Sequence, residues 1–140
     1  MADSQDQMQP WRGSVSLRFA PAADGTTQCQ GGARSPLKLL RHFTAADGRC
    51  VMPLLHTAGG LVGGDQLEIG LHAAAGSRSF LTSVAAQKIY GSRGRSRVQP
   101  QGRWAQITLQ AELEAGADLE WLPQETVVFA GALLEQQQQI

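Results

Sequence analysis

The sequence predicts an all-β fold, with mostly antiparallel sheets stacked as a sandwich-like scaffold and few or no helices. Two observations lead to this prediction. Apolar and polar residues alternate in several short segments. Turn-forming residues such as Gly and Asp separate these segments at intervals of roughly ten to fifteen residues. No window of helical length keeps a period of 3.6 residues.

The alternation is clearest in residues 13–20, 65–73 and 103–111. Successive side chains of a strand leave opposite faces of a sheet, so each segment has one apolar and one polar side. The predicted core-facing residues are Val15, Leu17, Phe19, Leu67, Ile69, Leu71, Ala105, Ile107 and Leu109.

Three further segments are predicted as strands on weaker patterns. Residues 78–86 and 125–130 are short apolar runs, typical of strands covered on both faces. Residues 37–43 are a weak helical candidate, and we prefer a strand there.

The length of 140 residues indicates one domain. We expect residues 1–12 to be a flexible arm and residues 13–140 to be the β-rich domain. The sequence stops inside an apparent strand with no closing turn, so we also expect a chain truncated at its C-terminal end.

Charge and cysteine content exclude some broad classes. The formal net charge is zero, so no overall field indicates nucleic acid or an anionic membrane. All basic residues lie between Arg12 and Arg103, and the part from Glu112 onward is purely acidic. Neither a signal peptide nor a membrane-length apolar run is present in the sequence. Cys29 and Cys50 lack CxxC spacing and are interpreted as reduced thiols, with a disulfide or thiolate metal site as alternatives.

The most unusual segment is residues 56–65, which contains two glycine pairs and ends on an aspartate. It runs from His56 to Asp65, and its glycines are Gly59, Gly60, Gly63 and Gly64. A phosphate-binding loop is disfavoured, because it requires Lys followed by Ser or Thr and then a helix. From the residues alone, two tight turns between strands are the simplest interpretation.

In the second segment, residues 82–92, Lys88 and Tyr90 are expected on one face of a strand. A lysine whose stem lies along a strand end is the simpler interpretation of Lys88. The basic loop that follows, residues 93–103, has Trp104 as its nearest ring, whereas single-strand binders normally offer several stacking rings. RNA binding is therefore a minor alternative to a solvated or protein-docking loop.

In the third segment, residues 117–132, Glu120 and Glu125 flank a bend marked by Pro123. The bend could turn both carboxylates towards one cavity. A hydrolase is disfavoured, because no GxSxG elbow is present and the three histidines lack HxH or HxxxH spacing.

Together and in this order, the segments resemble the UreD family of urease accessory proteins, also called UreH, over its N-terminal half. The resemblance extends from about Gly13 to Ile140. It departs from the family pattern at Thr57-Ala58, Gln87 and Gly91. The matching phrases are residues 35–38, 56–65, 85–90, 119–126 and 129–132.

This resemblance implies a cytoplasmic chaperone-like scaffold, not an enzyme, that assists nickel insertion into urease during maturation of that metalloenzyme. The implied partners are the urease subunits and UreF, with UreG recruited through UreF. Neither nucleic acid nor a membrane is among them. No cofactor is expected to be tightly bound, and nickel would only be in transit. The residues expected along a nickel passage are Asp65, Glu120, Glu125 and His56, with Lys88 and Tyr90 near it.

The strongest alternative is a protein-interaction β module that handles no metal, in which all these carboxylates are solvated. An RNA-binding domain would instead depend on the arginines of residues 93–103 and would weaken steeply with salt.

Overall fold

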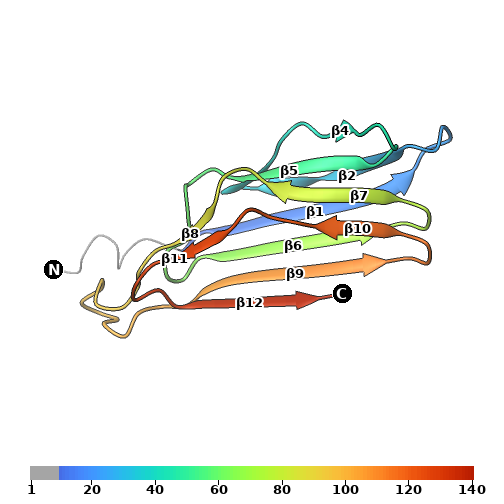
Figure 1. The fold of residues 1–140 in the computed structure, drawn as a ribbon. Coiled ribbons are helices and arrows are strands. Elements are labelled where there is room, and N and C mark those ends of the chain that lie inside the picture. The colour runs from blue at the N-terminus through green and yellow to red at the C-terminus, as the bar shows by residue number, and fades with distance from the viewer. Residues whose placement is uncertain (1–9) are drawn as a thin grey trace.

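The computed structural model describes residues 10–140, in which twelve β-strands and no helix are present (Figure 1). The predicted all-β class is therefore confirmed. Residues 1–9, most of the predicted arm, lie outside the described residues. Within residues 10–140, no helix is long and apolar enough to span a membrane. The strands are β1 (Arg12–Pro21), β2 (Thr27–Arg34), β3 (Leu37–Leu39), β4 (Phe43–Thr44), β5 (Cys50–His56), β6 (Gln66–Ala73), β7 (Arg78–Ser83), β8 (Gln87–Ile89), β9 (Ala105–Leu113), β10 (Asp118–Trp121), β11 (Thr126–Val128) and β12 (Leu134–Gln139).

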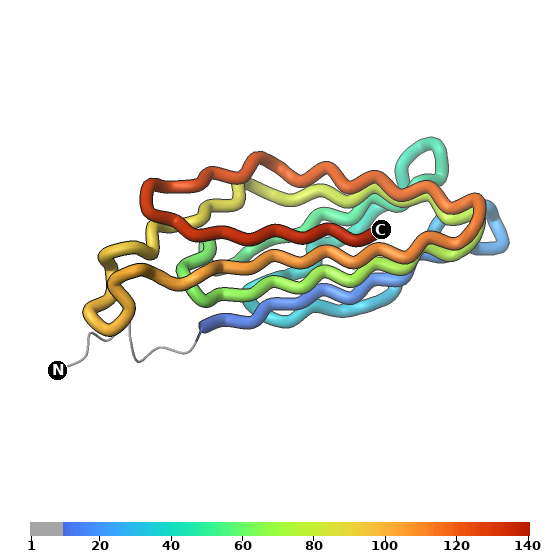
Figure 2. The backbone as a smooth tube through the Cα atoms, turned by 90° about the horizontal axis from the view of Figure 1, so that it is seen from below, coloured from blue at the N-terminus to red at the C-terminus, as the bar shows by residue number. Residues whose placement is uncertain are grey.

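Two five-stranded sheets and one strand pair make up this fold. Sheet A has the order β12-β9-β6-β1-β2, and Figure 2 shows its strands side by side from below. Sheet B has the order β10-β7-β5-β3, with β4 also pairing with β5. Sheet C is the pair of β8 and β11.

From β6 onward the chain winds as a coil. It passes from sheet A to sheet B, then to sheet C, and returns to sheet A to begin the next turn (Figure 1). Gln66 lies beside Gln106 in sheet A and Arg78 lies beside Asp118 in sheet B, so equivalent positions recur after about 40 residues, as in solenoid proteins.

The prediction of mostly antiparallel pairing is wrong. Among the described strands, six pairings are parallel and three are antiparallel. Alternating residues indicate a half-buried strand, but they do not specify the direction of its partner. The turns in the sequence mostly join strands of different sheets, whereas antiparallel neighbours would be joined directly by hairpins.

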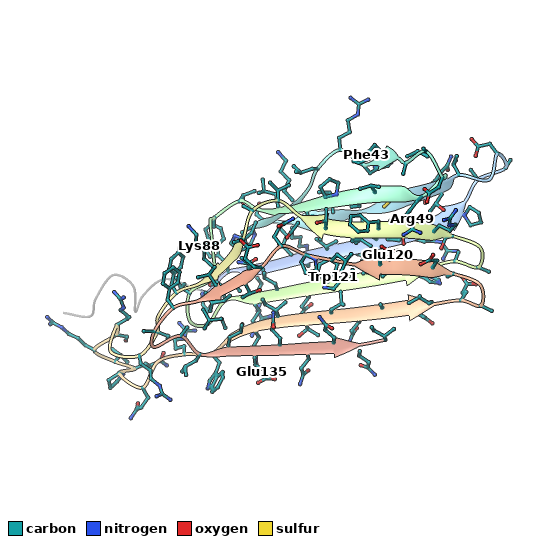
Figure 3. The ribbon with its side chains drawn as sticks, viewed as in Figure 1. Phe43, Arg49, Lys88, Glu120, Trp121 and Glu135 are labelled. Atoms are coloured by element: carbon teal, nitrogen blue, oxygen red, sulfur yellow. The ribbon has the colours of Figure 1, made fainter. Side chains whose placement is uncertain are left out.

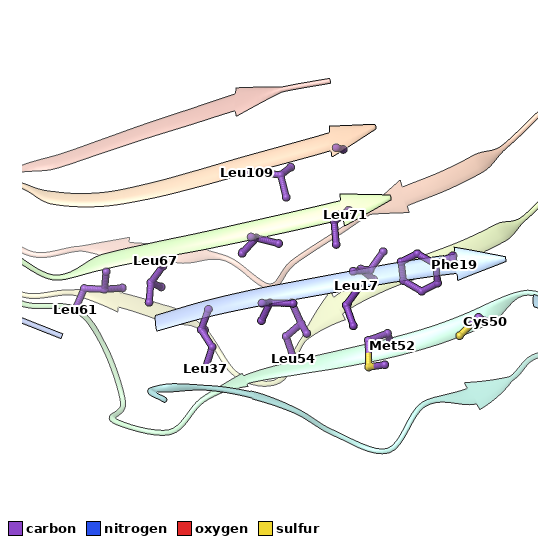
Figure 4. Packing of buried hydrophobic residues seen from close by; sticks show 14 of the residues in the cluster. Leu17, Phe19, Leu37, Cys50, Met52, Leu54, Leu61, Leu67, Leu71 and Leu109 are labelled. Carbon is purple, nitrogen blue, oxygen red and sulfur yellow. The ribbon is translucent and has the colours of Figure 1, made fainter. Parts of the chain in front are cut away.

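The core lies between sheets A and B, as a sandwich-like scaffold requires. Leu17 and Phe19 of β1 belong to the same buried cluster as Met52 and Leu54 of β5, and Figure 4 shows these side chains between the strands. The predicted core-facing residues of β1 and β6 are buried. The prediction that residues 125–130 form a strand covered on both faces is wrong, because all three residues of β11 are exposed.

Cys29 and Cys50 are free thiols that face each other across the two sheets. Cys29 belongs to β2 in sheet A, and the buried Cys50 begins β5 in sheet B. The hydrogen bond to Cys50, together with burial, raises the pKa of the Cys29 thiol. This thiol is therefore protonated at neutral pH.

The adjacent glycines of β2 provide a test of the β1–β2 pairing. Gly31 has a φ of 149°, and a Cβ there would overlap the carbonyl oxygen of Ser16, whereas a Cβ at Gly32 would meet nothing within 4 Å. We expect Gly31→Ala to lower the free energy of unfolding by about 1–3 kcal/mol, since the backbone must shift. Gly32→Ala is the matched control and should change it by less than about 0.5 kcal/mol. Urea denaturation measures both, and equal effects would contradict this register.

Candidate functional site

Parts of the three segments singled out in the sequence meet at one end of the molecule, where β1, β6, β9 and β12 begin (Figure 1). The Leu61 N–H donates to the Lys88 carbonyl at 2.8 Å, and the Tyr90 N–H donates to the Leu61 carbonyl at 2.9 Å. This bridge joins the glycine segment to β8. β8 pairs in parallel with β11, which brings the third segment to the same place.

Glycine is required where these segments approach most closely. A Cβ at Gly60 would lie 2.7 Å from the Lys88 carbonyl oxygen and 2.7 Å from the Tyr90 ring. A Cβ at Gly64 would lie 2.7 Å from the guanidinium of Arg103. A larger side chain at Gly60 would push the glycine segment away from the backbone of β8, whereas at Gly64 the Arg103 side chain could move and the φ of 94° is what favours glycine.

Asp65 connects three parts of the chain. Its Oδ1 accepts the Trp11 N–H at 3.0 Å, and its Oδ2 accepts the Val62 N–H at 3.0 Å. Its own carbonyl accepts the Gln106 N–H at 2.9 Å. The residue is 6% exposed, so both carboxylate oxygens are used to hold the backbone where β1 begins and where the glycine segment turns.

His56 ends β5 with both ring nitrogens buried and without a hydrogen-bond partner among the described residues. Burial lowers the pKa of the imidazole, and the nearby Asp65 carboxylate partly offsets this effect. Asp65 thus lies within electrostatic range of His56, and burial favours the neutral form of the imidazole. A neutral imidazole has a free lone pair, as metal binding requires.

Lys88 and Tyr90 differ in their surroundings. The Lys88 side chain is exposed, and its backbone carbonyl is the acceptor in the bridge to Leu61. The Tyr90 ring stacks on Phe129 with 5.4 Å between the ring centroids and 14° between their planes. The Tyr90 hydroxyl donates to the Gly59 carbonyl at 3.4 Å.

Glu120 and Glu125 do not converge on one cavity. Glu120 lies on β10 and forms an ion pair with Arg49, which also lies 3.5 Å from Asp118 (Figure 3). Glu125 is exposed beyond the bend, and its backbone carbonyl accepts the Gln87 N–H at 2.9 Å. Figure 3 shows Glu120 well away from Lys88. Lys88 pairs with Val127 of β11, the strand that follows Glu125.

The four residues expected along a nickel passage thus fall into three places. His56 and Asp65 lie at the two ends of the glycine segment, Glu120 is paired with an arginine, and Glu125 is exposed. Within residues 10–140, no group of three or more His, Cys, Asp or Glu side chains is arranged to hold a metal ion.

A pocket of about 890 Å³ opens beside the glycine segment. Asp65 and Tyr90 line it, together with Arg95 and Arg103 of the basic loop, Phe129 of the third segment, and Trp11, which the sequence patterns did not single out. In the sequence, the basic loop is visible only as a run of charge. The contact of Arg103 with Gly64 could not be predicted from neighbouring residues in the sequence, because the two residues lie in different turns of the coil.

Comparison with known proteins gives a consistent result. A family model described as UreD urease accessory protein matches residues 12–140. A protein named urease accessory protein UreD from Synechococcus sp. (strain RCC307) is 91% identical over 140 residues, which is 100% of this chain and 45% of that protein. Its namesake from Synechococcus sp. (strain CC9311) is 57% identical over 130 residues, covering 93% of this chain and 44% of that protein.

A more distant relative of the same name, from Prochlorococcus marinus (strain MIT 9313), is 52% identical over 138 residues. That match covers 94% of this chain and 43% of the relative. The chain therefore spans less than half the length of each of these relatives.

The two backbone hydrogen bonds accepted by Asp65 can be tested by removing one acceptor. We expect Asp65→Asn to lower the free energy of unfolding by about 1–3 kcal/mol, because the amide NH₂ would face a backbone N–H instead of accepting from it. Glu68→Gln is the control, since Glu68 is exposed and has no side-chain hydrogen bond within residues 10–140. Chemical denaturation measures both variants. An equal loss of stability in the two would argue against the structural role of Asp65.

Burial of His56 predicts a pH dependence of stability. The pKa of His56 is lowered in the folded state, so below about pH 6.5 the unfolded chain binds more protons. Stability should therefore fall as the pH drops below that value, and the loss should be complete below the folded-state pKa. His56→Gln should flatten this slope in denaturation series across pH, whereas His42→Gln, at an exposed position, should leave it unchanged. An unaltered slope in His56→Gln would assign the effect to other groups.

Proposed function

Because the chain belongs to the UreD family of urease accessory proteins, we propose that it is the N-terminal half of a scaffold that assists nickel insertion into urease. The match of the family model over residues 12–140 carries this proposal. The scaffold is cytoplasmic and binds the urease subunits and UreF, through which UreG is recruited. The family is named for its accessory role, and the proposal assigns no catalysed reaction to the chain.

The proposed cargo is nickel in transit, taken up from the other accessory proteins and passed on to urease. Ni²⁺ accepts nitrogen and oxygen ligands, and a strong cage would hold it against release. Separate weak ligands suit transfer better. His56 supports this view, because its imidazole nitrogens lack partners among the described residues and burial favours the neutral form that ligates metals.

The strongest alternative is docking without any contact with the metal. It is favoured by the apolar side chains exposed on and around β11, which include Leu122, Val127, Val128 and Phe129. Such surfaces often mark protein interfaces. Both proposals include partner binding, and they differ in whether the polar residues affect nickel delivery.

Co-expression of the full-length protein with the urease subunits and UreF tests the scaffold. We expect a stable complex that co-purifies and elutes as one species in size-exclusion chromatography. The urease from these cells should contain nickel and be active. Lack of co-purification by the soluble, folded full-length protein would contradict the scaffold role.

The same cells distinguish passage from docking if Glu125→Gln replaces the wild-type protein. Glu125 is exposed and its carboxylate has no partner within residues 10–140, so this variant should fold normally. A lower nickel content of urease with an intact complex supports passage. Unchanged nickel content favours docking alone. Asp65→Ala is a poorer probe, because it also removes two backbone hydrogen bonds.

A further inference from the structure

The pocket beside the glycine segment combines aromatic rings with arginines. Its volume is about 890 Å³, within the range of sites that bind small molecules or short peptide segments. The rings come from the start of β1, from the residue after β8 and from the residue after β11. The residues that matter here are Trp11, Tyr90, Val98, Phe129, Arg95 and Arg103.

No acidic side chain within residues 10–140 pairs with the arginines of the pocket. Within residues 10–140, neither Arg95 nor Arg103 forms an ion pair, whereas Arg49 and Arg78 at the other end of the molecule are paired with acidic residues. Among the described residues of the pocket wall, Asp65 alone carries a carboxylate, and both of its oxygens accept backbone N–H groups. The guanidinium groups are therefore available to an anionic ligand, which they can hold through two parallel hydrogen bonds.

The apolar part of the wall is partly open to solvent. Trp11 is 45% exposed, Tyr90 is 38% exposed and Phe129 is 44% exposed. Tyr, Trp and Arg are enriched among the residues that contribute most to binding at protein interfaces, where they become desolvated anchors. The composition of this pocket is thus that of a protein-binding site.

Backbone groups around the pocket are poorly placed to bind a phosphate. The Gly64 N–H donates to the Trp104 carbonyl, and the N–H groups of Ser92 and Arg93 both donate to the Gly131 carbonyl. Phosphate loops instead point several free N–H groups at the ligand. Recognition of an anion in this pocket therefore depends on arginine side chains.

The ring arrangement also disfavours single-stranded RNA. Tyr90 and Phe129 stack on each other, so each ring covers one face of the other. Binders of single strands instead present separate rings, on which successive bases stack. The exposed edges and outer faces of this ring pair suit an aromatic or aliphatic side chain.

We propose that this pocket binds an acidic segment of a protein partner, with carboxylates on Arg95 and Arg103 and an apolar side chain against Tyr90 and Phe129. The charge complementarity of the wall specifies the acidic character, and the ring pair specifies the neighbouring apolar anchor. This inference goes beyond the proposed scaffold function and does not depend on it, because it concerns the peptide chemistry that the pocket accepts.

A phage-displayed library of random heptapeptides, panned against the full-length protein, tests the proposal without requiring the partner to be identified first. We expect enrichment of peptides with two or more Asp or Glu residues beside an aromatic or aliphatic residue. A synthetic peptide of the enriched sequence should bind in fluorescence anisotropy, and its affinity should fall as salt is raised. Enrichment without acidic residues would overturn the proposal.

Arg95 and Arg97 provide a matched pair of variants. Both are exposed on the same loop, but only Arg95 lines the pocket. Arg95→Ala should weaken binding of the enriched peptide about tenfold, the effect expected for losing one charge-assisted contact. Arg97→Ala should leave binding unchanged. Thermal melts confirm that both variants are folded.

Equal affinities of the two variants would overturn the assignment of the pocket. Binding of a labelled oligouridylate that requires Arg95, with no Arg95-dependent binding of the peptide, would overturn it in favour of RNA. These readouts measure peptide binding alone. A failure here therefore leaves the scaffold proposal standing, and a failure of urease maturation leaves this result unaffected.

Discussion

Parallel pairing is the constraint on which the rest of this structure depends. A strand cannot be followed directly by a parallel neighbour, because the chain must first return to the other end of the sheet. In many proteins a helix makes that return. Here strands of sheet B and sheet C make it, so the return path supplies the second layer of the sandwich and its half of the core. Leu71 of β6 and Leu81 of β7 belong to this one cluster because the winding carries the chain from sheet A to sheet B between them.

The coil also explains why residues far apart in sequence meet at one end. Each turn of the chain passes this end once, so the glycine segment, β8, the basic loop and β11 are stacked there (Figure 1). Asp65 fixes the stack by holding Trp11 and Val62, and Gly60 lets β8 approach. At the opposite end, short turns connect strands of sheet A to strands of sheet B, and the ion pairs of Arg49 lie there. The two ends thus differ in chemistry: one is braced by ion pairs, and the other presents open aromatic and basic surface.

The sequence predicted β1, β6 and β9, because alternation is a local property that each of these segments carries by itself, but β2 and the central strand β5 were not predicted. The inward direction of Val15, Leu17 and Phe19 follows from their spacing alone. Strand direction and partner choice are not local, so the sheet pairing could not be predicted in the same way. The same limit applies to the site. The importance of residues 56–65 was evident from the glycines, but the pairing of Glu120 with Arg49 depends on the coil register.

The hairpin of β1 and β2 has a consequence for self-association. A coil of parallel strands ends in an exposed strand edge, and an identical molecule could add to such an edge and extend it into a fibre. β2 runs antiparallel to β1 at this edge of sheet A, which interrupts the parallel stacking. Its outer residues are mostly exposed and polar, and Gly31 and Gly32 give little surface for a neighbour to pack on. The antiparallel strand β2 therefore leaves little apolar surface at this edge of sheet A for a second molecule to pack on.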